Sequence, residues 1–393
     1  MKSIFRIGAG AVLGAALALA PFAGASAKTK VKLAFIGPLS GGSASLGVGG
    51  RNSADLAVRL YNADPKRKYD IELVALDDEC KPNVGVQVAT KAAADPKIVG
   101  GVTHYCSAVA MSTVDVYHKF GLPIIVWGAV LPDITYGNDY PEIHRVNGTM
   151  VNQNQVAAEF MTGRGFKTWV ILHDTTDYGK GHDKYFSQYV TEKGGKILAD
   201  FGVTADQQDF TAELTKAKEL KPDVIYFGGL TPLGVRIRQQ MDKLGIKAQF
   251  EGVSGIVSEA FVEGLDPKLA EGTLAFREGA AAEKLPGGKF FLAAYEKAKF
   301  DQGPDAYGAF AFASAKLLME AVDAVGPDRK KITKYLGSIK NRDSITGPIT
   351  FDDHGQNTVA LITKYVVQDG KWVMWEDSEF ASGKRTLPGK AGK

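Results

Sequence analysis

The chain has 393 residues, with 47 Lys and Arg residues against 44 Asp and Glu residues and a formal net charge of +3. A balance this close to neutral gives no electrostatic reason to expect a nucleic-acid partner or binding to a membrane surface. Hydrophobic residues make up 45% of the chain, which is enough for a globular protein with a sizeable core. The length fits two domains of ordinary size.

The N-terminus has the pattern of a secretory signal peptide. Lys2 and Arg6 form a short basic region, residues 7–20 are apolar and rich in Ala and Gly, and Ala25-Ser26-Ala27 is a small-x-small cleavage site. The apolar stretch is too short to span a membrane comfortably. No cysteine follows the cleavage site, so we predict a soluble periplasmic protein cleaved after about Ala27, without a lipid anchor.

The two cysteines are Cys80 and Cys106, and each closely follows a predicted strand. In an exported protein such a pair indicates one disulfide. Both strands are predicted to belong to one parallel sheet, where the Cα atoms of the two cysteines could come within bridging range. Two buried free thiols are the alternative.

The first half of the chain alternates strands and helices. The strands are predicted at 31–36, 69–75, 98–102 and 123–127, and the helices at 49–62, 83–94 and 108–120. This alternation is typical of a parallel sheet with right-handed crossovers.

A short strand at 142–147 is followed by a second alternating series. Helices are predicted at 151–164, 180–193, 212–220 and 234–244, and strands at 169–173, 196–202, 224–227 and 248–252. One sheet of this length would be unusually large, so two α/β lobes of about five strands each are the simpler interpretation.

The C-terminal third changes character. An extended run at 272–277 precedes helices at 288–300, 304–325 and 331–339. Antiparallel strands are then predicted at 347–351, 359–368 and 372–376. Residues 382–393 are rich in Gly, Pro and Lys and are predicted to form a loose tail.

The stretch 101–132 is the best candidate for a binding site. Tyr105, Cys106 and Ser107 follow one strand, and Gly128-Ala129-Val130 follow the next. Loops at the carboxyl ends of parallel strands line one edge of a sheet, where open α/β folds bind ligands. The helix that begins near Ser107 offers free backbone N–H groups, which suit a carboxylate. Trp127 ends its strand and could line the cleft or the core.

The ordered set of loop motifs resembles one known family. The motifs are Gly37-Pro38-Leu39-Ser40-Gly41, Asp77-Asp78-Glu79-Cys80, Tyr105-Cys106-Ser107, Pro132-Asp133-Ile134-Thr135, His173-Asp174, Tyr178-Gly179-Lys180-Gly181, Gly228-Gly229, Gly347-Pro348-Ile349 and Phe351-Asp352. Together they resemble the periplasmic solute-binding proteins of ABC importers of the branched-chain amino-acid type. Each motif is weak alone, but the order and spacing hold over nearly the whole mature chain.

The resemblance implies two Rossmann-like lobes, each a parallel sheet flanked by helices, joined by three crossing strands with a ligand cleft between the lobes. The crossings are expected at 142–147, 273–277 and 347–351. Lobe 1 would comprise 28–144 plus 278–346, and lobe 2 would comprise 145–277 plus 347–381. Such proteins close on their ligand by hinge motion and deliver it to an inner-membrane ABC permease. The resemblance also implies a monomer without a cofactor.

The family's ligand contacts carry over to four positions. Ser107 matches the hydroxyl that grips the ligand carboxylate, Gly128 and Ala129 match backbone contacts, and Tyr178 matches an aromatic residue of the opposing lobe. Four other positions depart from the family pattern: Val130 replaces a threonine, Leu46 an aromatic residue, Leu230 a tyrosine, and Ser254 the acid that neutralises the ligand ammonium group.

The change at Ser254 leaves two ligand classes open. A buried ammonium group without a counter-charge is costly, so one hypothesis is an aromatic or apolar carboxylic acid with no obligatory ammonium group. In the other, Glu251 or Glu259 supplies the acid and the ligand is a hydrophobic amino acid.

Other functions find less support in the sequence. The histidines show no metal-ligand spacing, so neither a metal site nor a cofactor is expected. His173-Asp174 fits a structural hydrogen bond better than catalysis. An exported hydrolase could use Ser107 and His104, but no third member is visible. A periplasmic sensor with the same fold remains the alternative to a transport protein.

Overall fold

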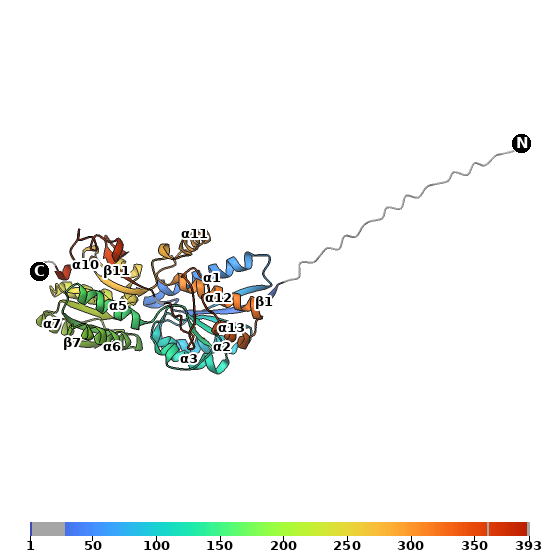
Figure 1. Cartoon of the computed structure of the whole chain (residues 1–393), viewed down its shortest axis with the longest axis horizontal. Coiled ribbons are helices and arrows are strands. Elements are labelled where there is room, and N and C mark those ends of the chain that lie inside the picture. Colours follow the sequence, from blue (N-terminus) through green and yellow to red (C-terminus); the bar gives the residue numbers. More distant parts are fainter. Residues whose placement is uncertain (2–27, 360, 391–393) are drawn as a thin grey trace.

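The computed structural model describes Met1 and residues 28–359 and 361–390. The predicted signal peptide lies outside these residues. None of the described helices combines the length and the apolar character that a membrane span requires. The described chain forms two parallel-stranded sheets flanked by helices, one at each end of an elongated molecule (Figure 1).

The first sheet has the strand order β2-β1-β3-β4-β5, and all neighbours are parallel. Its strands are β1 (Thr29–Gly37), β2 (Tyr69–Asp77), β3 (Ile98–Thr103), β4 (Ile124–Val126) and β5 (Ile143–Arg145). Its helices are α1 (Ala44–Ala63), α2 (Pro82–Ala94), α3 (Ser107–Phe120), α4 (Asp133–Tyr136), α11 (Gly288–Ala298), α12 (Gly308–Val325) and α13 (Arg329–Gly337). We call this sheet and these helices the first lobe.

The second sheet has the order β12-β11-β10-β9-β8-β6-β7. Its strands are β6 (Thr168–Asp174), β7 (Lys196–Val203), β8 (Val224–Gly228), β9 (Gln249–Gly252), β10 (Leu274–Glu278), β11 (Ile362–Gln368) and β12 (Lys371–Met374). Its helices are α5 (Met150–Gly163), α6 (Asp177–Glu192), α7 (Thr211–Leu220), α8 (Thr231–Lys243), α9 (Glu259–Glu263) and α10 (Pro267–Ala270). This second lobe has more strands than the five expected, because β10 joins the sheet parallel to β9 and the antiparallel hairpin of β11 and β12 extends it further.

The strands of the first sheet are buried on both faces. Leu33 and Phe35 of β1 pack in the core beneath α1 and α12, whereas Ala34 and Ile36 pack in the core on the opposite face. A strand covered by helices on both faces has a nearly continuous apolar sequence, and residues 33–36 of β1 are all fully buried. The predicted α/β class is therefore confirmed.

The chain passes from the first sheet to the second between Arg145 and Met150 and returns after Glu278, next to two of the predicted crossings. The predicted third crossing at 347–351 is wrong. Ile349 pairs with Arg342 in an antiparallel bridge, and it packs with Phe351 in the core of the first lobe. The segment is a turn that folds back onto its own lobe. The third passage lies between Asn357 and β11.

The predicted loose tail is also wrong for the described residues up to 390. Arg385 forms ion pairs with Glu271, Asp369 and Glu379 at 2.5, 3.0 and 2.6 Å. Leu387 is buried against the second lobe. Composition suggested a loose tail, but Glu271 and Asp369 are distant in sequence and only the fold brings them to Arg385.

Candidate functional site

A cavity of about 350 Å³ lies between the two lobes, at the carboxyl ends of their parallel strands. This volume falls near the lower end of the range of small-molecule sites, about 300–1,000 Å³. Six of the predicted ligand residues line it: Tyr105, Ser107, Gly128, Tyr178, Leu230 and Ser254. The first three come from the first lobe and the other three from the second.

Ser107 is the first residue of α3 and is buried. The backbone N–H groups of Val130 and Leu131 donate hydrogen bonds to its Oγ at 3.2 and 3.3 Å. Because both bonds use the oxygen as acceptor, the hydroxyl hydrogen remains available to donate to a ligand. The free N–H groups of the first turn of α3 lie at the same place, so this wall of the cavity suits an anion.

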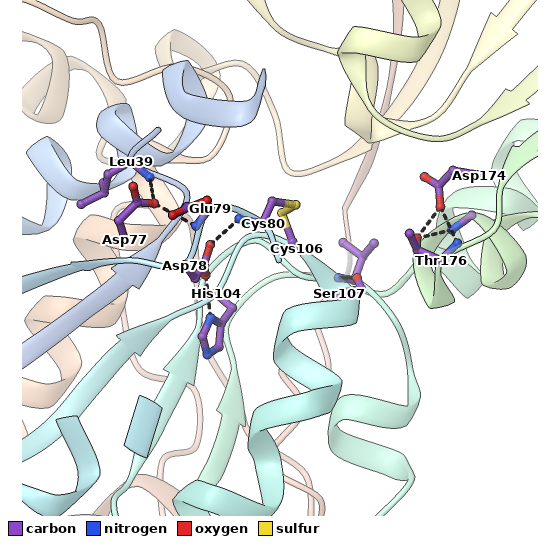
Figure 2. The surroundings of a disulfide bond; sticks show 12 residues. Leu39, Asp77, Asp78, Glu79, Cys80, His104, Cys106, Ser107, Asp174 and Thr176 are labelled. Atoms are coloured by element: carbon purple, nitrogen blue, oxygen red, sulfur yellow. Dashed lines mark hydrogen bonds and ion pairs between the residues drawn. A yellow bond between two sulfur atoms is a disulfide. The ribbon is translucent and has the colours of Figure 1, made fainter. Parts of the chain in front are cut away.

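The loop that carries Ser107 is fastened to its neighbours. Cys80 and Cys106 form the predicted disulfide, with a Cα–Cα distance of 5.5 Å. Asp78 Oδ1 accepts a hydrogen bond from the Cys80 N–H at 2.9 Å, and Asp78 Oδ2 lies 2.9 Å from His104 Nδ1. Figure 2 shows this chain of contacts beside Ser107. The loops after β2 and β3 therefore form one connected unit.

His104 has no role as a base for Ser107. With Nδ1 donating to Asp78, its Nε2 accepts a hydrogen bond from the Tyr117 hydroxyl at 2.6 Å. Burial raises the pKa of Tyr117 well above its ordinary value, so this phenol keeps its proton. Both ring nitrogens are engaged away from Ser107, which removes the catalytic pair that a hydrolase would need.

The second lobe supplies an aromatic residue and apolar side chains, together with the carboxyl groups of Asp174 and Asp206. Tyr178 lies in the first turn of α6, and its hydroxyl accepts a hydrogen bond from the Gly255 N–H at 2.9 Å and lies 3.2 Å from Ser254 Oγ. Burial raises the pKa of Tyr178 well above its ordinary value, so the hydroxyl stays neutral. Leu230 precedes α8 and lines the cavity beside it.

Neither glutamate considered as a replacement for the missing acid lines the cavity. Glu251 is fully buried in β9, where Trp169 Nε1 donates to it at 3.4 Å, and burial raises its pKa well above the ordinary range. Glu259 begins α9 and is exposed. Ser254 itself lines the cavity and is buried.

Four predicted site residues are absent from the cavity wall: Leu46, Trp127, Ala129 and Val130. Trp127 is fully buried, with its ring 5.5 Å from that of Phe35 and 5.8 Å from that of Tyr105. A Cβ atom at Gly50 would lie 2.7 Å from the Trp127 ring, which shows how closely α1 packs on it. Trp127 is a core residue that supports the cavity through Tyr105.

Leu46 faces the core of the first lobe from α1. Ala129 and Val130 are buried in the core on the opposite face of the sheet. The Val130 side chain does not line the cavity, but its backbone N–H orients Ser107. A valine in place of the family's threonine at position 130 therefore removes a hydroxyl group and also changes the packing behind Ser107.

Sequence reasoning missed several lining residues. Tyr307 lies just before α12, and its hydroxyl donates to Glu278 Oε2 at 2.9 Å. Asp174 also lines the cavity, opposite Ser107 (Figure 2). The Thr176 N–H donates to Asp174 Oδ1 at 2.9 Å, and burial raises the pKa of Asp174. The His173-Asp174 motif was a signal for this position, whereas nothing in the sequence marks Tyr307.

Known proteins share this architecture and much of this sequence. A family model described as a periplasmic binding protein matches residues 30–371. The chain is 31% identical to the leucine-, isoleucine-, valine-, threonine- and alanine-binding protein of Pseudomonas aeruginosa, over 87% of this chain and 91% of that protein. It is 28% identical to the Leu/Ile/Val-binding protein of Escherichia coli K12, over 88% and 92%.

Solved structures agree. A branched-chain amino-acid transporter substrate-binding protein from Streptococcus pneumoniae, in complex with isoleucine, superposes with a TM-score of 0.79 at 26% identity, over 88% of this chain and all of that one. A solute-binding protein from R. palustris, in complex with benzoate, has the same TM-score at 21% identity and covers 88% and 95%. The latter likeness concerns the fold alone.

These relatives are substrate-binding proteins, in agreement with the prediction that the chain is not an enzyme. The matched region covers both lobes and the cavity between them. The chain therefore belongs to the periplasmic binding proteins, a family that works outside the cytoplasm, and within it to the branched-chain amino-acid type.

Proposed function

We propose that this protein captures a small carboxylate-bearing solute between its lobes and delivers it to an inner-membrane ABC permease. The observation that carries the proposal is the Ser107 hydroxyl at the start of α3, which lines an interlobe cavity with its hydrogen free to donate. A helix N-terminus and a hydroxyl together favour a carboxylate. A periplasmic sensor would use the same site, and loss of solute uptake in cells that lack the protein distinguishes the importer from it.

We further propose that the solute is an aromatic or apolar acid without an obligatory ammonium group. Three tyrosines, Tyr105, Tyr178 and Tyr307, line the cavity together with leucine and proline side chains. The resemblance to the family implies that Ser254 replaces its acid; Ser254 lines the cavity, whereas Glu251 is buried in β9. An ammonium group brought into this cavity would lose hydration without gaining the usual counter-charge.

A hydrophobic amino acid is the second candidate. The curated relatives are named for leucine, isoleucine and valine. Glu79, Asp174 and Asp206 all line the cavity and offer carboxyl groups to an ammonium ion. Asp174 is the buried one of the three. However, Asp174 Oδ1 already accepts hydrogen bonds from the Thr176 backbone and hydroxyl, which reduces its capacity for a ligand.

A thermal-shift screen of ligand-stripped mature protein tests the ligand class. The panel contains leucine, valine and phenylalanine beside benzoate, phenylacetate and cinnamate. A ligand at 100 times its Kd stabilises by about 2.7 kcal/mol, which gives a measurable rise in Tm. We expect a response to the aromatic acids. Stabilisation by leucine with none by the aromatic acids would overturn the ligand proposal but leave the binding function intact.

Ser254→Glu is the sharper test. A carboxylate at this position would restore the family's counter-charge beside the Tyr178 hydroxyl, so we expect weaker binding of aromatic acids and new binding of leucine. Ser254→Gln is the matched control, because it adds the same bulk without charge. If both variants behave alike, the charge at position 254 does not set the ligand class.

A further inference from the structure

His173, Asp183 and Asp200 lie together on the second lobe, apart from the residues that line the interlobe cavity. His173 is near the end of β6, Asp183 is in α6, and Asp200 is in β7. One nitrogen of the histidine and one oxygen of each carboxylate all lie within 4.8 Å of one another. Donor atoms this close can share one metal ion.

The histidine has the tautomer that a metal ligand needs. Its Nδ1 lies 2.9 Å from the backbone carbonyl oxygen of Asp174. A carbonyl oxygen only accepts hydrogen bonds, so the proton of a neutral ring is on Nδ1 and the lone pair is on Nε2. A histidine that binds metal through one nitrogen commonly donates the other N–H to such a carbonyl, which fixes the ring orientation.

The Nε2 atom has no hydrogen-bond partner among the described residues. Asp200 Oδ1 lies 3.6 Å from it, which is beyond hydrogen-bond distance. His173 is only 9% exposed, so water has limited access to the ring. In a neutral imidazole the Nε2 lone pair is therefore not used in a hydrogen bond, and a carboxylate lies beside it.

The two acids also have defined positions. The Ser187 hydroxyl, one turn further along α6, donates to Asp183 Oδ1 at 2.9 Å. Asp200 lies on the edge strand with a side chain that is 42% exposed, so the pair is accessible from solvent. Two carboxylates this close repel each other, and a cation between them would remove the repulsion.

We propose that His173, Asp183 and Asp200 bind a divalent first-row transition-metal ion of the Zn²⁺ class. One imidazole nitrogen and two carboxylate oxygens suit Zn²⁺ and its neighbours, whereas Mg²⁺ and Ca²⁺ prefer oxygen ligands alone. Water would complete the coordination. The ion would fasten α6, which carries Tyr178 in its first turn, to the β6–β7 edge of the sheet.

The alternative is a simple ion pair, in which a protonated His173 faces Asp200 without a metal. It differs from the proposal in the state of Nε2, which would carry a proton. This proposal is independent of the identity of the cavity ligand, because none of the three residues lines the cavity.

The test uses tag-free, chelator-treated mature protein and follows Tm during a titration with ZnCl₂. We expect Tm to rise with Zn²⁺ and to stay constant with Mg²⁺. Asp200→Asn and Asp183→Asn should each weaken the response at least about tenfold, since each removes one of three ligands. Glu192→Gln, on the exposed C-terminal end of the same helix, is the matched control and should respond as the wild type does.

Nitrogen-15 NMR of labelled histidine adds a site-specific measurement. The proposal requires a neutral His173 with its proton on Nδ1 and a Zn²⁺-dependent shift of the Nε2 resonance. An imidazolium that keeps both protons in excess Zn²⁺ would overturn it. So would an absence of any Tm rise, or a rise that the two Asn variants leave unchanged.

Discussion

The two walls of the interlobe cavity are built on different principles. The wall from the first lobe is polar and fastened, with Ser107 held by two backbone N–H groups and its loop tied by the Cys80–Cys106 disulfide. The wall from the second lobe combines apolar side chains with the carboxyl groups of Asp174 and Asp206, and the hydroxyl groups of Tyr178 and Ser254 lie 3.2 Å apart.

The difference suggests a division of labour. A rigid, polar wall can recognise the carboxylate that every candidate ligand shares, because its donors are oriented before binding. In the second wall the Tyr178 and Ser254 hydroxyl groups are already paired, so its apolar side chains select the ligand by shape. We infer that substitutions in the first lobe reduce binding of all ligands, whereas substitutions in the second lobe change which ligand is preferred.

The largest expected effect comes from removing the disulfide of the first wall. The bridge closes a loop with a sequence separation of 26 residues, and the chain-entropy model gives a loss of about 3–4 kcal/mol in the free energy of unfolding for a loop of this size. Chemical denaturation of the Cys80→Ser/Cys106→Ser double variant measures it. As a control, the wild-type protein denatured under reducing conditions should lose the same amount of stability as the double variant. An unchanged denaturation midpoint in the variant would contradict the prediction.

Ser107→Ala should follow in size. A hydrogen bond to a charged group contributes about 1.5–3 kcal/mol, so we expect affinity for every carboxylate ligand to fall by about 10- to 100-fold. Isothermal titration calorimetry gives the affinity. Ser112→Ala is the matched control on the same helix, since its hydroxyl donates to the backbone carbonyls of Val109 at 2.8 Å and Pro82 at 3.5 Å and does not line the cavity. Equal losses in both variants would place the carboxylate elsewhere.

A pH titration compares the two lobes through one buried histidine in each. Burial lowers the pKa of His144, in β5, to about 4 and that of His182, in α6, to about 3, from 6.5. Between each lowered pKa and 6.5, the unfolded chain therefore binds more protons than the folded protein does. The stabilisation is complete above pH 6.5 and is lost as the pH falls toward 4, by about 1.4 kcal/mol per pH unit for each histidine.

His144→Phe should remove the contribution of this histidine, so the unfolding free energy should fall by about 1.4 kcal/mol less than in the wild type between pH 6 and pH 5. Urea denaturation at the two pH values measures it. His118→Phe, at an exposed histidine of the same lobe, is the control and should keep the wild-type slope. A wild-type slope in the His144 variant would show that another group dominates acid destabilisation.

The smallest expected effect is on ligand affinity, through the contact between Gly42 of the first lobe and Pro232 of the second lobe. A Cβ atom at Gly42 would lie 2.6 Å from Cγ of Pro232 in the opposing lobe. Gly42→Val should therefore hinder closure and weaken ligand binding by about tenfold, or about 1.4 kcal/mol, without changing Tm of the ligand-free protein. Adding Pro232→Ala should restore part of the affinity. Absence of this rescue would mean that Gly42 acts within its own loop.

Much of the architecture could be predicted from local patterns. The alternation of apolar strands and amphipathic helices indicated an α/β fold, and the motifs after β1, β2 and β3 indicated the family. The Cys80–Cys106 disulfide followed from two cysteines that each closely follow a strand of the same parallel sheet. These features depend on residues close together in the chain or on the order of short motifs, which sequence preserves.

Other features depend on contacts between distant segments. The turn at 347–351 folds back on Arg342 instead of crossing, and Arg385 finds its acidic partners only in the folded second lobe. Trp127 packs in the core because α1 approaches it at Gly50. The local sequence pattern is the same for a crossing strand as for a segment that folds back, and for a loose tail as for a packed one. Long-range packing therefore had to decide between them.

The sequence by itself therefore determined the fold class, the disulfide and the Ser107 wall, because hydrophobic periodicity and loop motifs are local properties of the chain. Tertiary structure alone brought Tyr307 and Asp174 to the cavity, removed Glu251 from it, and assembled His173, Asp183 and Asp200 from three separate elements. The physical reason is that a binding site depends on distances between side chains, and only the packing of the lobes sets those distances.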